Sequence, residues 1–256
     1  MKTLATSFTL FLALFIVPWP NAVAQACSKQ SPAHTVALLE LYTSEGCSSC
    51  PPADQFVSKL RDAGLTAEQV VPLSLHVDYW DYIGWKDIYA KRTFTERQRW
   101  LSERASSRTI YTPEIFVAGK ELRNWRSGVP AAVRRANERP AQADIRIALG
   151  ALSDAGLPVD VNAQSAQGGQ LFVALYENGL TSVIRAGENR GVTLQHDYVV
   201  RDWIGPIALN GAPGKAQLQR ALALPAGAAK NLGVAAFVQS DTGEVLQALA
   251  LPVCAG

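Results

Sequence analysis

The chain has 256 residues, of which 48% are hydrophobic and 18% are charged, and its formal net charge is +2 at pH 7. This composition supports well-packed cores, and the length predicts one large domain or two small ones. Basic and acidic residues are interspersed along the chain, so the charge pattern does not indicate a nucleic acid or an anionic membrane surface as a partner.

The first residues have the pattern of a secretory signal peptide. Lys2 precedes an apolar run over residues 8–17, and residues 22–24 supply the small-x-small pattern that signal peptidase recognises. The run is too short to cross a membrane, and no later segment is long enough. We therefore expect a signal peptide over residues 1–24, a periplasmic or secreted protein, and no membrane span after cleavage. Lipidation at Cys27 is the alternative, which the bulky Gln25 disfavours.

The mature chain contains four cysteines, Cys27, Cys47, Cys50 and Cys254. The predicted export permits disulfides, and Cys47 and Cys50 form one natural pair because they are close in sequence. Cys27 and Cys254 then remain, and a structural disulfide between them would tie the two ends of the mature chain together.

Residues 27–140 alternate between strand-like and helix-like segments. Short apolar runs predict buried strands over residues 36–42, 70–77 and 114–117. The spacing of apolar side chains predicts helices over residues 51–61, 87–104 and 129–137, with room for a hairpin strand near residues 121–125. This alternation predicts an α/β domain with a partly parallel sheet that helices cover on both faces.

The cysteine pair at residues 47–50 lies between the first predicted strand and the first predicted helix. A CxxC at such a junction is typical of a thioredoxin-like redox centre. The start of a helix carries partial positive charge and free N–H groups, which stabilise a thiolate. We therefore predict that Cys47 is the exposed nucleophile and that Cys50 is the buried resolving thiol.

Two further residues are candidates for the catalytic chemistry. Pro113 directly precedes the third predicted strand, where a thioredoxin fold has a cis-proline that faces the disulfide. The Thr112–Pro113 bond is therefore predicted to be cis, and the backbone of Thr112 is predicted to bind substrate. Glu40 lies in the first predicted strand, and we predict either that it relays the proton of Cys50 or that it is a partly exposed acid or pairs with a lysine.

Polar and aromatic side chains gather where the second predicted strand ends, namely His76, Asp78, Trp80, Asp81, Tyr82 and Trp85. In open α/β sheets, ligands bind outside the carboxyl ends of the strands. Trp80, Tyr82 and Trp85 are therefore predicted to form a substrate-binding wall beside the cysteines. The alternative is an aromatic lid over the edge of the core.

Metal binding is the main alternative to redox chemistry at the cysteines. The histidines are His34, His76 and His196, and none stands at the spacing of a zinc site. A copper carrier with this fold would use Cys47, Cys50 and His76, although such carriers usually have a longer cysteine spacing than CxxC. A passive staple is the third interpretation, which the strain of CxxC disulfides disfavours.

Residues 141–256 have a different pattern from the first half. Short, often alternating segments predict an all-β, sandwich-like domain that begins near residue 141. One stretch of this half is polar and charged, and its candidate residues are Glu188, Asn189, Arg190, His196 and Arg201. They are predicted to organise a long loop by hydrogen bonds, or alternatively to line a groove for a partner.

Five motifs together resemble a known family: VALLELYTSEGCSSCPPAD, LSLHVDYWDYIGWKD, FTERQR, YTPEIFVAG and AGENRGVTLQHDYVVR. They are similar to uncharacterised secreted bacterial proteins with a thioredoxin-like fold, which are catalogued as a domain of unknown function. The motifs extend over most of the mature chain. The resemblance implies the fold and a CxxC centre, and it implies no substrate.

The sequence therefore predicts an exported thiol–disulfide oxidoreductase. Its partners would be protein thiols or disulfides of other exported proteins, and we expect no cofactor. Two alternatives from other classes remain open at this stage. The first is a copper-delivery module that uses Cys47, Cys50 and His76, and the second is a non-catalytic binding protein.

Overall fold

The computed structural model describes residues 27–107, 109–225 and 231–254, so the predicted signal peptide lies outside the described residues. The helices in this part of the chain all precede residue 141. They are α1 (Pro51–Ser58), the short 3-10 helix η1 (Asp81–Ile83), α2 (Arg92–Arg104) and α3 (Trp125–Asn137). None of them has the length and apolar character that crossing a bilayer requires.

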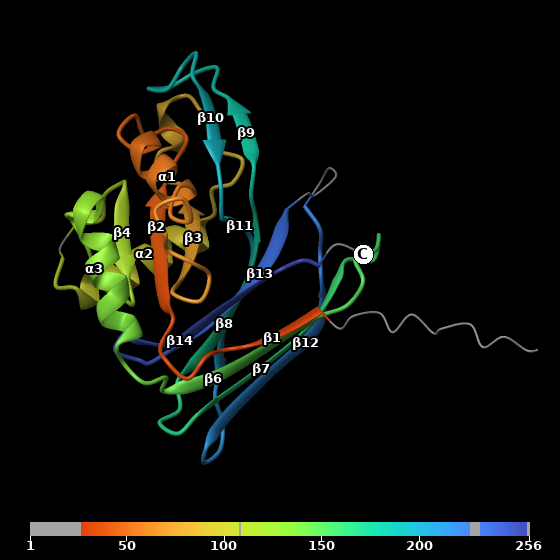
Figure 1. The fold of residues 1–256 in the computed structure, drawn as a ribbon. Helices are drawn as coiled ribbons and strands as arrows, with labels where there is room; N and C mark the ends of the chain where they lie inside the picture. Colours follow the sequence, from red (N-terminus) through yellow and green to blue (C-terminus); the bar gives the residue numbers. More distant parts are fainter. Residues whose placement is uncertain (1–26, 108, 226–230, 255–256) are drawn as a thin grey trace, which may run out of the picture.

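One eight-stranded sheet extends through the molecule (Figure 1). In spatial order its strands are β14 (Val245–Pro252), β13 (Leu232–Gln239), β8 (Gln170–Glu177), β11 (Val199–Ala208), β3 (Val70–His76), β2 (Ala37–Thr43), β4 (Glu114–Val117) and β5 (Lys120–Glu121). β3 lies parallel to both β2 and β11, and the other neighbouring pairs are antiparallel.

The main sheet joins the two halves of the chain. β11 belongs to the second half, and it pairs with β3 of the first half through Val199 and Ser74. The helices of the described residues end with α3 at Asn137, and β6 (Ala143–Leu149) is the next element. The α/β part and the all-β part therefore share one hydrogen-bonded sheet.

A second sheet packs on the main sheet at the lower end of Figure 1. It has four strands, in the order β1 (Cys27–Gln30), β6, β7 (Leu157–Ser165) and β12 (Gly214–Leu222). Along β6 and β7 buried side chains alternate with more exposed ones, as expected of strands that bury one face. Their buried members share a core with Val234, Ala236 and Leu249 of β13 and β14. This part is a sandwich of two sheets.

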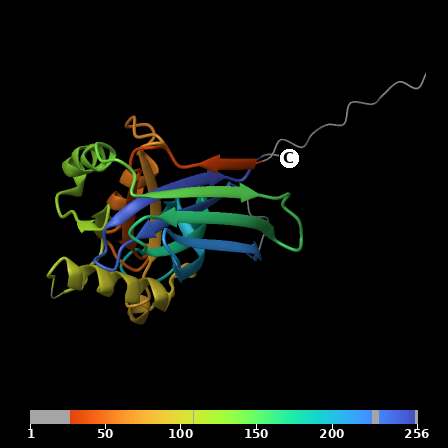
Figure 2. The same cartoon turned by 90° about the horizontal axis from the view of Figure 1, so that it is seen from below.

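The helices cover both faces of the main sheet, so α2 and α3 lie on opposite sides in the view from below (Figure 2). Successive side chains of a strand point to opposite faces. Glu40 of β2 contacts Arg97 of α2, whereas Thr43 contacts Asp54 of α1. Every residue of β2 and β3 is buried because both faces are covered.

Two predicted helices differ from the structure at their first residues. The helix expected from residue 87 begins at Arg92, because the Asp87 carboxylate accepts hydrogen bonds from the N–H groups of Glu45 and Tyr89 and holds the preceding segment as a loop. The helix expected from residue 129 begins earlier, at Trp125.

Candidate functional site

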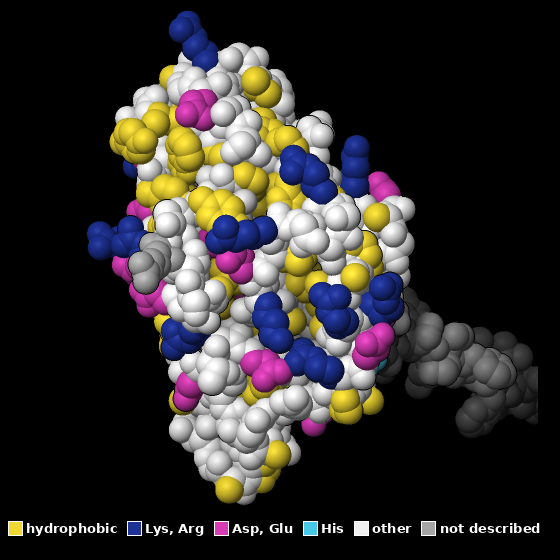
Figure 3. All heavy atoms as spheres, turned by 90° about the vertical axis from the view of Figure 1, so that its left-hand side faces the viewer, with side chains coloured by type: hydrophobic (Ala, Val, Ile, Leu, Met, Phe, Trp, Pro, Cys, Tyr) yellow, Lys and Arg dark blue, Asp and Glu magenta, His cyan; other side chains and the backbone are white. Residues whose placement is uncertain are grey.

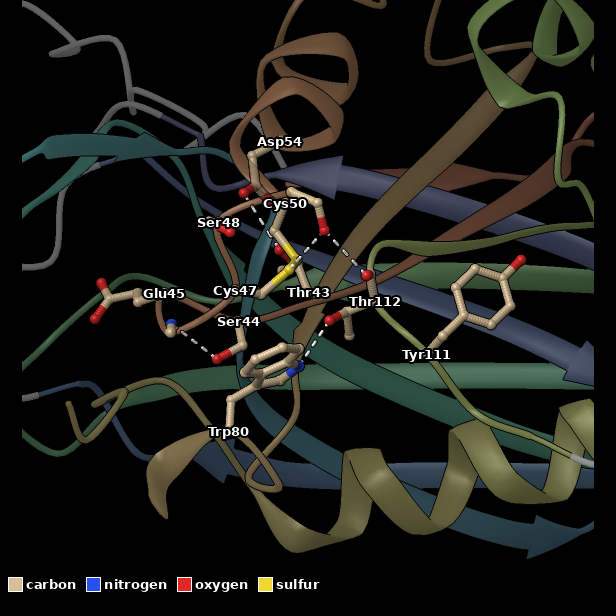
Figure 4. Close-up of a disulfide and its surroundings, with 12 residues drawn as sticks. Thr43, Ser44, Glu45, Cys47, Ser48, Cys50, Asp54, Trp80, Tyr111 and Thr112 are labelled. Atoms are coloured by element: carbon tan, nitrogen blue, oxygen red, sulfur yellow. Dashed lines mark hydrogen bonds between the residues drawn. A yellow bond between two sulfur atoms is a disulfide. The ribbon is translucent and has the colours of Figure 1, made fainter. Parts of the chain in front are cut away.

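The Cys47–Cys50 disulfide lies between the end of β2 and the start of α1 (Figure 4). The residues that carry it form the cysteine loop, residues 44–50, whose turns are closed by backbone hydrogen bonds from Cys47 to Ser44 and from Cys50 to Cys47. A second disulfide joins Cys27 to Cys254. These are the two pairs expected from the sequence.

The Thr112–Pro113 peptide bond is cis, and Thr112 faces the cysteine loop. The hydroxyl of Ser49 connects the two: Ser49 Oγ donates to the carbonyl oxygen of Thr112 at 3.4 Å and lies 3.4 Å from Cys47 Sγ. The backbone that was predicted to bind substrate is therefore one side chain away from the sulfur that was predicted to react.

Cys47 is fully buried, so the prediction of an exposed nucleophile is wrong for this conformation. Part of its cover is the loop between β9 (Leu180–Val183) and β10 (Thr193–His196), which we call the covering loop, residues 184–192. Asn189 Nδ2 donates to the carbonyl oxygens of Glu45 and Cys47 at 2.8 and 3.0 Å. Glu188 Oε2 accepts from the N–H of Ser48 at 3.0 Å.

These contacts change the interpretation of the polar segment in the second half of the chain. The segment organises a loop by hydrogen bonds, as predicted. The partners of Glu188 and Asn189, however, are backbone groups of the cysteine loop in the other half of the chain. Arg201 lies elsewhere and pairs with Glu177, while Arg190 is exposed. Sequence reasoning missed the contact of Glu188 and Asn189 with the cysteines.

Few N–H groups at the start of α1 are free to stabilise a thiolate. The first two helical residues, Pro51 and Pro52, have no N–H. The next two N–H groups donate to the carbonyl oxygen of Cys50, and the N–H of Ser48 donates to Glu188. The helix therefore supplies fewer donors than the sequence interpretation assumed.

A group of buried ionisable side chains surrounds the cysteine loop, and we call it the His76 cluster: Glu45, Asp54, His76, Asp87 and His196. His76 Nδ1 lies 2.7 Å from Asp87 Oδ2, and Thr43 Oγ1 donates to Asp54 Oδ2 at 3.2 Å. Glu45 Oε2 accepts from the indole N–H of Trp85 at 2.7 Å. The members come from the cysteine loop, α1, β3, the segment after β3, and β10.

Burial and charge act on these groups in different directions. Burial alone would lower the pKa of His76, but the neighbouring Asp87 carboxylate outweighs it and the pKa is raised. Burial tends to raise the pKa of Asp87, and the charge and hydrogen bond of His76 bring it below its usual value. The pKa of Asp54 is raised, mainly by burial.

The His76 cluster is incompletely hydrogen-bonded. Among the described residues, four of its buried atoms have no hydrogen-bond partner: Glu45 Oε1, His76 Nε2, and both ring nitrogens of His196. Glu45 Oε1 lies 3.3 Å from His196 Nε2, but the two atoms are not aligned for a hydrogen bond. Unpaired buried polar atoms are rare in proteins, so this group is a candidate for proton transfer or for internal water.

Glu40 does not lie beneath the disulfide, contrary to the first predicted role. It also differs from the alternative of a partly exposed or lysine-paired acid, because it is buried and its partner is an arginine. Arg97 Nε and Nη2 donate to its two carboxylate oxygens at 2.6 and 3.1 Å, and Tyr42 Oη donates to Oε1 at 3.1 Å. Glu40 thus faces α2, on the side of the sheet opposite to α1, which Thr43 contacts. Asp54 of α1 is a buried acid on the cysteine side, and sequence reasoning missed it.

Two of the three predicted wall residues contact the site. Trp80 Nε1 donates to Thr112 Oγ1 at 2.7 Å, and Trp85 contacts Glu45 as described above. Tyr82, between them, is 83% exposed. Asp78 and Asp81 hold the segment itself, since Asp78 accepts from Thr95 Oγ1 and Asp81 accepts from the N–H of Asp87.

The described residues give no support to the copper interpretation. No group of three or more His, Cys, Asp or Glu side chains in this part of the chain is arranged to hold a metal ion. One nitrogen of His76 is paired with Asp87, and both cysteines are in the disulfide. His34 lies elsewhere, with Nε2 at 2.8 Å from the carbonyl oxygen of Glu68.

Two solved structures resemble this fold. A crystal structure of a protein from Agrobacterium tumefaciens superposes with a TM-score of 0.61 at 23% identity, covering 86% of this chain and 96% of the other. HBP35 of Porphyromonas gingivalis superposes with a TM-score of 0.65 at 16% identity, covering 88% of this chain and 79% of the other. At these identities the likeness concerns the fold alone.

The sequence itself was also compared with known families and proteins. No curated protein matches it. A family model described as "Protein of unknown function (DUF1223)" matches residues 38–239, which include the cysteine loop, the Thr112–Pro113 bond and the covering loop. Because this match spans most of the sequence, the chain belongs to the DUF1223 family.

Proposed function

We propose that this protein is an exported thiol–disulfide oxidoreductase that acts on other exported proteins. The observation that carries the proposal is the position of the Cys47–Cys50 disulfide, at the end of a central strand and facing the Thr112–Pro113 loop. The strand order β3-β2-β4-β5 with helices on both faces supports a thioredoxin-like interpretation of residues 27–140. The two disulfides support an oxidising compartment.

In the reducing direction, the Cys47 thiolate attacks a disulfide sulfur of the substrate. A mixed disulfide forms, and the second substrate sulfur leaves as a thiolate. Cys50 then loses its proton and attacks the sulfur of Cys47, which releases the first substrate sulfur and closes the Cys47–Cys50 bond. Two electrons pass from the pair to the substrate, and oxidation of a substrate dithiol is the same sequence reversed.

Asp54 is the candidate acceptor for the proton of Cys50. It lies four residues later in the chain, its N–H donates to the carbonyl oxygen of Cys50, and side chains at this spacing share one helix face (Figure 4). The raised pKa of Asp54, mainly from burial, suits a carboxyl group that exchanges a proton.

Exposed hydrophobic side chains on the segments next to the cysteine loop support a polypeptide substrate. Of the five large hydrophobic residues that are exposed among the described residues, four lie on the two segments that border the cysteine loop, namely Tyr82, Ile88, Val183 and Val192. Hydrophobic side chains also gather at the upper end of the face in Figure 3, while Lys and Arg gather farther down. An apolar border of this kind suits an unfolded chain better than a small, charged thiol.

Exchange activity of the mature chain tests the proposal, with insulin reduction and reactivation of scrambled ribonuclease as assays. Cys47→Ala should abolish both activities, and Cys50→Ala should trap mixed disulfides with the substrate. The matched control is Cys27→Ser/Cys254→Ser, which should retain exchange while the free energy of unfolding falls by about 2–4 kcal/mol. Full activity in Cys47→Ala would refute the proposed nucleophile.

A further inference from the structure

The covering loop brings a carboxylate to the cysteine pair. Glu188 Oε2 accepts a hydrogen bond from the N–H of Ser48, the residue directly after Cys47, across 140 positions of sequence. Contacts with Ser48 lower the pKa of Glu188, so the side chain remains an anion at neutral pH. Asn189, the next residue, fixes the covering loop on the carbonyl oxygens of the cysteine loop.

The position of this carboxylate matters once the disulfide is reduced. A thiolate at Cys47 needs nearby N–H donors and positive charge. Pro51 and Pro52 provide no N–H, and the N–H of Ser48 is already bonded to an anion. A thiolate at Cys47 and the carboxylate of Glu188 would therefore compete for one donor and repel each other.

We propose that Glu188 is a positioning residue that opposes ionisation of the Cys47 thiol and so limits the reactivity of the reduced pair. The inference rests on the proposed function, in which the Cys47 thiolate is the nucleophile. It assigns part of the control of the cysteines to the second half of the chain, whose role in the chemistry the sequence did not indicate.

Other ionisable groups lie around the same loop, and the test must separate Glu188 from them. The buried ones are the His76 cluster: Glu45, Asp54, His76, Asp87 and His196. The exposed ones on the covering loop are Arg185 and Arg190. Glu188→Gln changes none of these, and its amide oxygen still accepts the hydrogen bond from Ser48, so the variant removes the charge and preserves the contact.

The experiment measures alkylation of Cys47 by iodoacetamide in the reduced mature protein between about pH 4 and pH 10, with peptide mapping to separate the four cysteines. Glu188→Gln should alkylate about threefold to tenfold faster than the parent at pH 7, and Glu188→Lys faster still. The matched control is Glu138→Gln, an exposed carboxylate at the end of α3, which should follow the parent. About 1 M salt should shrink the difference, because it screens exposed charges.

Two results would overturn the inference. One is an unchanged pH profile in both Glu188 variants. The other is an equal acceleration at every pH, including the plateau where Cys47 is fully ionised, because that pattern reports access to the sulfur and not its charge. Alkylation requires no exchange activity, so a shifted profile in a protein that reduces no substrate would sustain the role of Glu188 and refute the proposed function.

Discussion

The main sheet buries charged groups on both faces, and the two groups differ in how fully they are hydrogen-bonded. On the α2 face, Arg97 donates to both oxygens of Glu40 and to Gln239 Oε1. Its guanidinium also packs 4.9–5.0 Å from the centres of three aromatic rings. On the cysteine face, both nitrogens of His196 and one oxygen of Glu45 have no hydrogen-bond partner within the part of the chain that the structure describes.

This difference suggests a division of roles between the two faces. A buried ion pair whose donors and acceptors are all hydrogen-bonded is rigid and does not need to exchange protons. Buried groups that lack hydrogen-bond partners lower the stability of the fold. Proteins retain such groups where the chemistry requires a change of protonation or a bound water. The comparison therefore predicts large stability effects on the α2 face and smaller, pH-dependent effects on the cysteine face.

Arg97→Met should give the largest loss of stability. It leaves the Glu40 carboxylate buried without its counter-charge, since the side chains of Glu40 and Arg97 are 1% and 7% exposed. Removing one partner of a buried ion pair costs about 3–5 kcal/mol, which urea denaturation at pH 7 would measure. The matched control is Arg99→Met, an exposed position on the same helix, where the change should be small.

A second substitution sharpens this prediction. Glu40→Gln in the Arg97→Met background removes the unpaired charge and should recover part of the lost free energy of unfolding. If the double variant were less stable than Arg97→Met alone, Glu40 would be stabilising the fold by some route other than its ion pair.

The His76–Asp87 pair should make stability depend on pH. The raised pKa of His76 gives stability that is complete below its unfolded value of about 6.5 and is lost as the pH rises through the folded value. The lowered pKa of Asp87 gives stability that is complete above about 3.9 and is lost as the pH falls through the folded value. The pair therefore stabilises the fold most between these two limits.

His76→Gln tests this dependence, because glutamine can still donate to Asp87 but does not titrate. The parent should lose about 1.5–3 kcal/mol of unfolding free energy between pH 6 and pH 9, the usual contribution of a hydrogen bond to a charged group. Urea denaturation at several pH values across this range should show that the free energy of unfolding depends less on pH in the variant. His34→Gln, outside the cluster, should retain the slope of the parent; identical slopes in all three proteins would contradict the assignment.

Asp54→Asn should give the smallest change in stability, and the change should be an increase. The raised pKa of Asp54 means that its ionised form is disfavoured in the folded state, so its stability contribution is complete below about pH 3.9 and is lost as the pH rises. The variant should gain about 1 kcal/mol at pH 8 and nothing below about pH 4.

The same variant should slow exchange, because it removes the proposed acceptor for the proton of Cys50. Asp62→Asn, an exposed position just beyond α1, is the matched control for both measurements. If Asp54→Asn exchanged disulfides as fast as the parent, Asp54 would not be the acceptor for the proton of Cys50.

Local sequence patterns predicted the features that depend on neighbouring residues. The cysteine pair at a strand–helix junction and the proline before the third strand follow from spacing within a few residues. The side on which Glu40 lies was not predictable, because all seven residues of β2 are buried and a strand that is buried throughout has no alternation that distinguishes the two faces.

Local sequence patterns could not predict the contact between the covering loop and the cysteine loop. Asn189 and Cys47 are 142 positions apart, and the chain that follows the covering loop continues through β10 into β11, which pairs with β3 in the shared sheet. A single sequence carries no signal for that pairing. Gly187 and Gly191 lie within the covering loop and have positive φ angles, and such glycines predict a tight turn without indicating what it contacts.

The Cys27–Cys254 disulfide closes residues 27–254 into a covalent ring. A protease that cuts this ring once opens it but separates nothing, so the nicked protein keeps its mass until a reductant is added. Because Cys27 and Cys254 lie together, new termini introduced in an exposed loop and a short linker between these two residues should yield a permuted chain with the same topology.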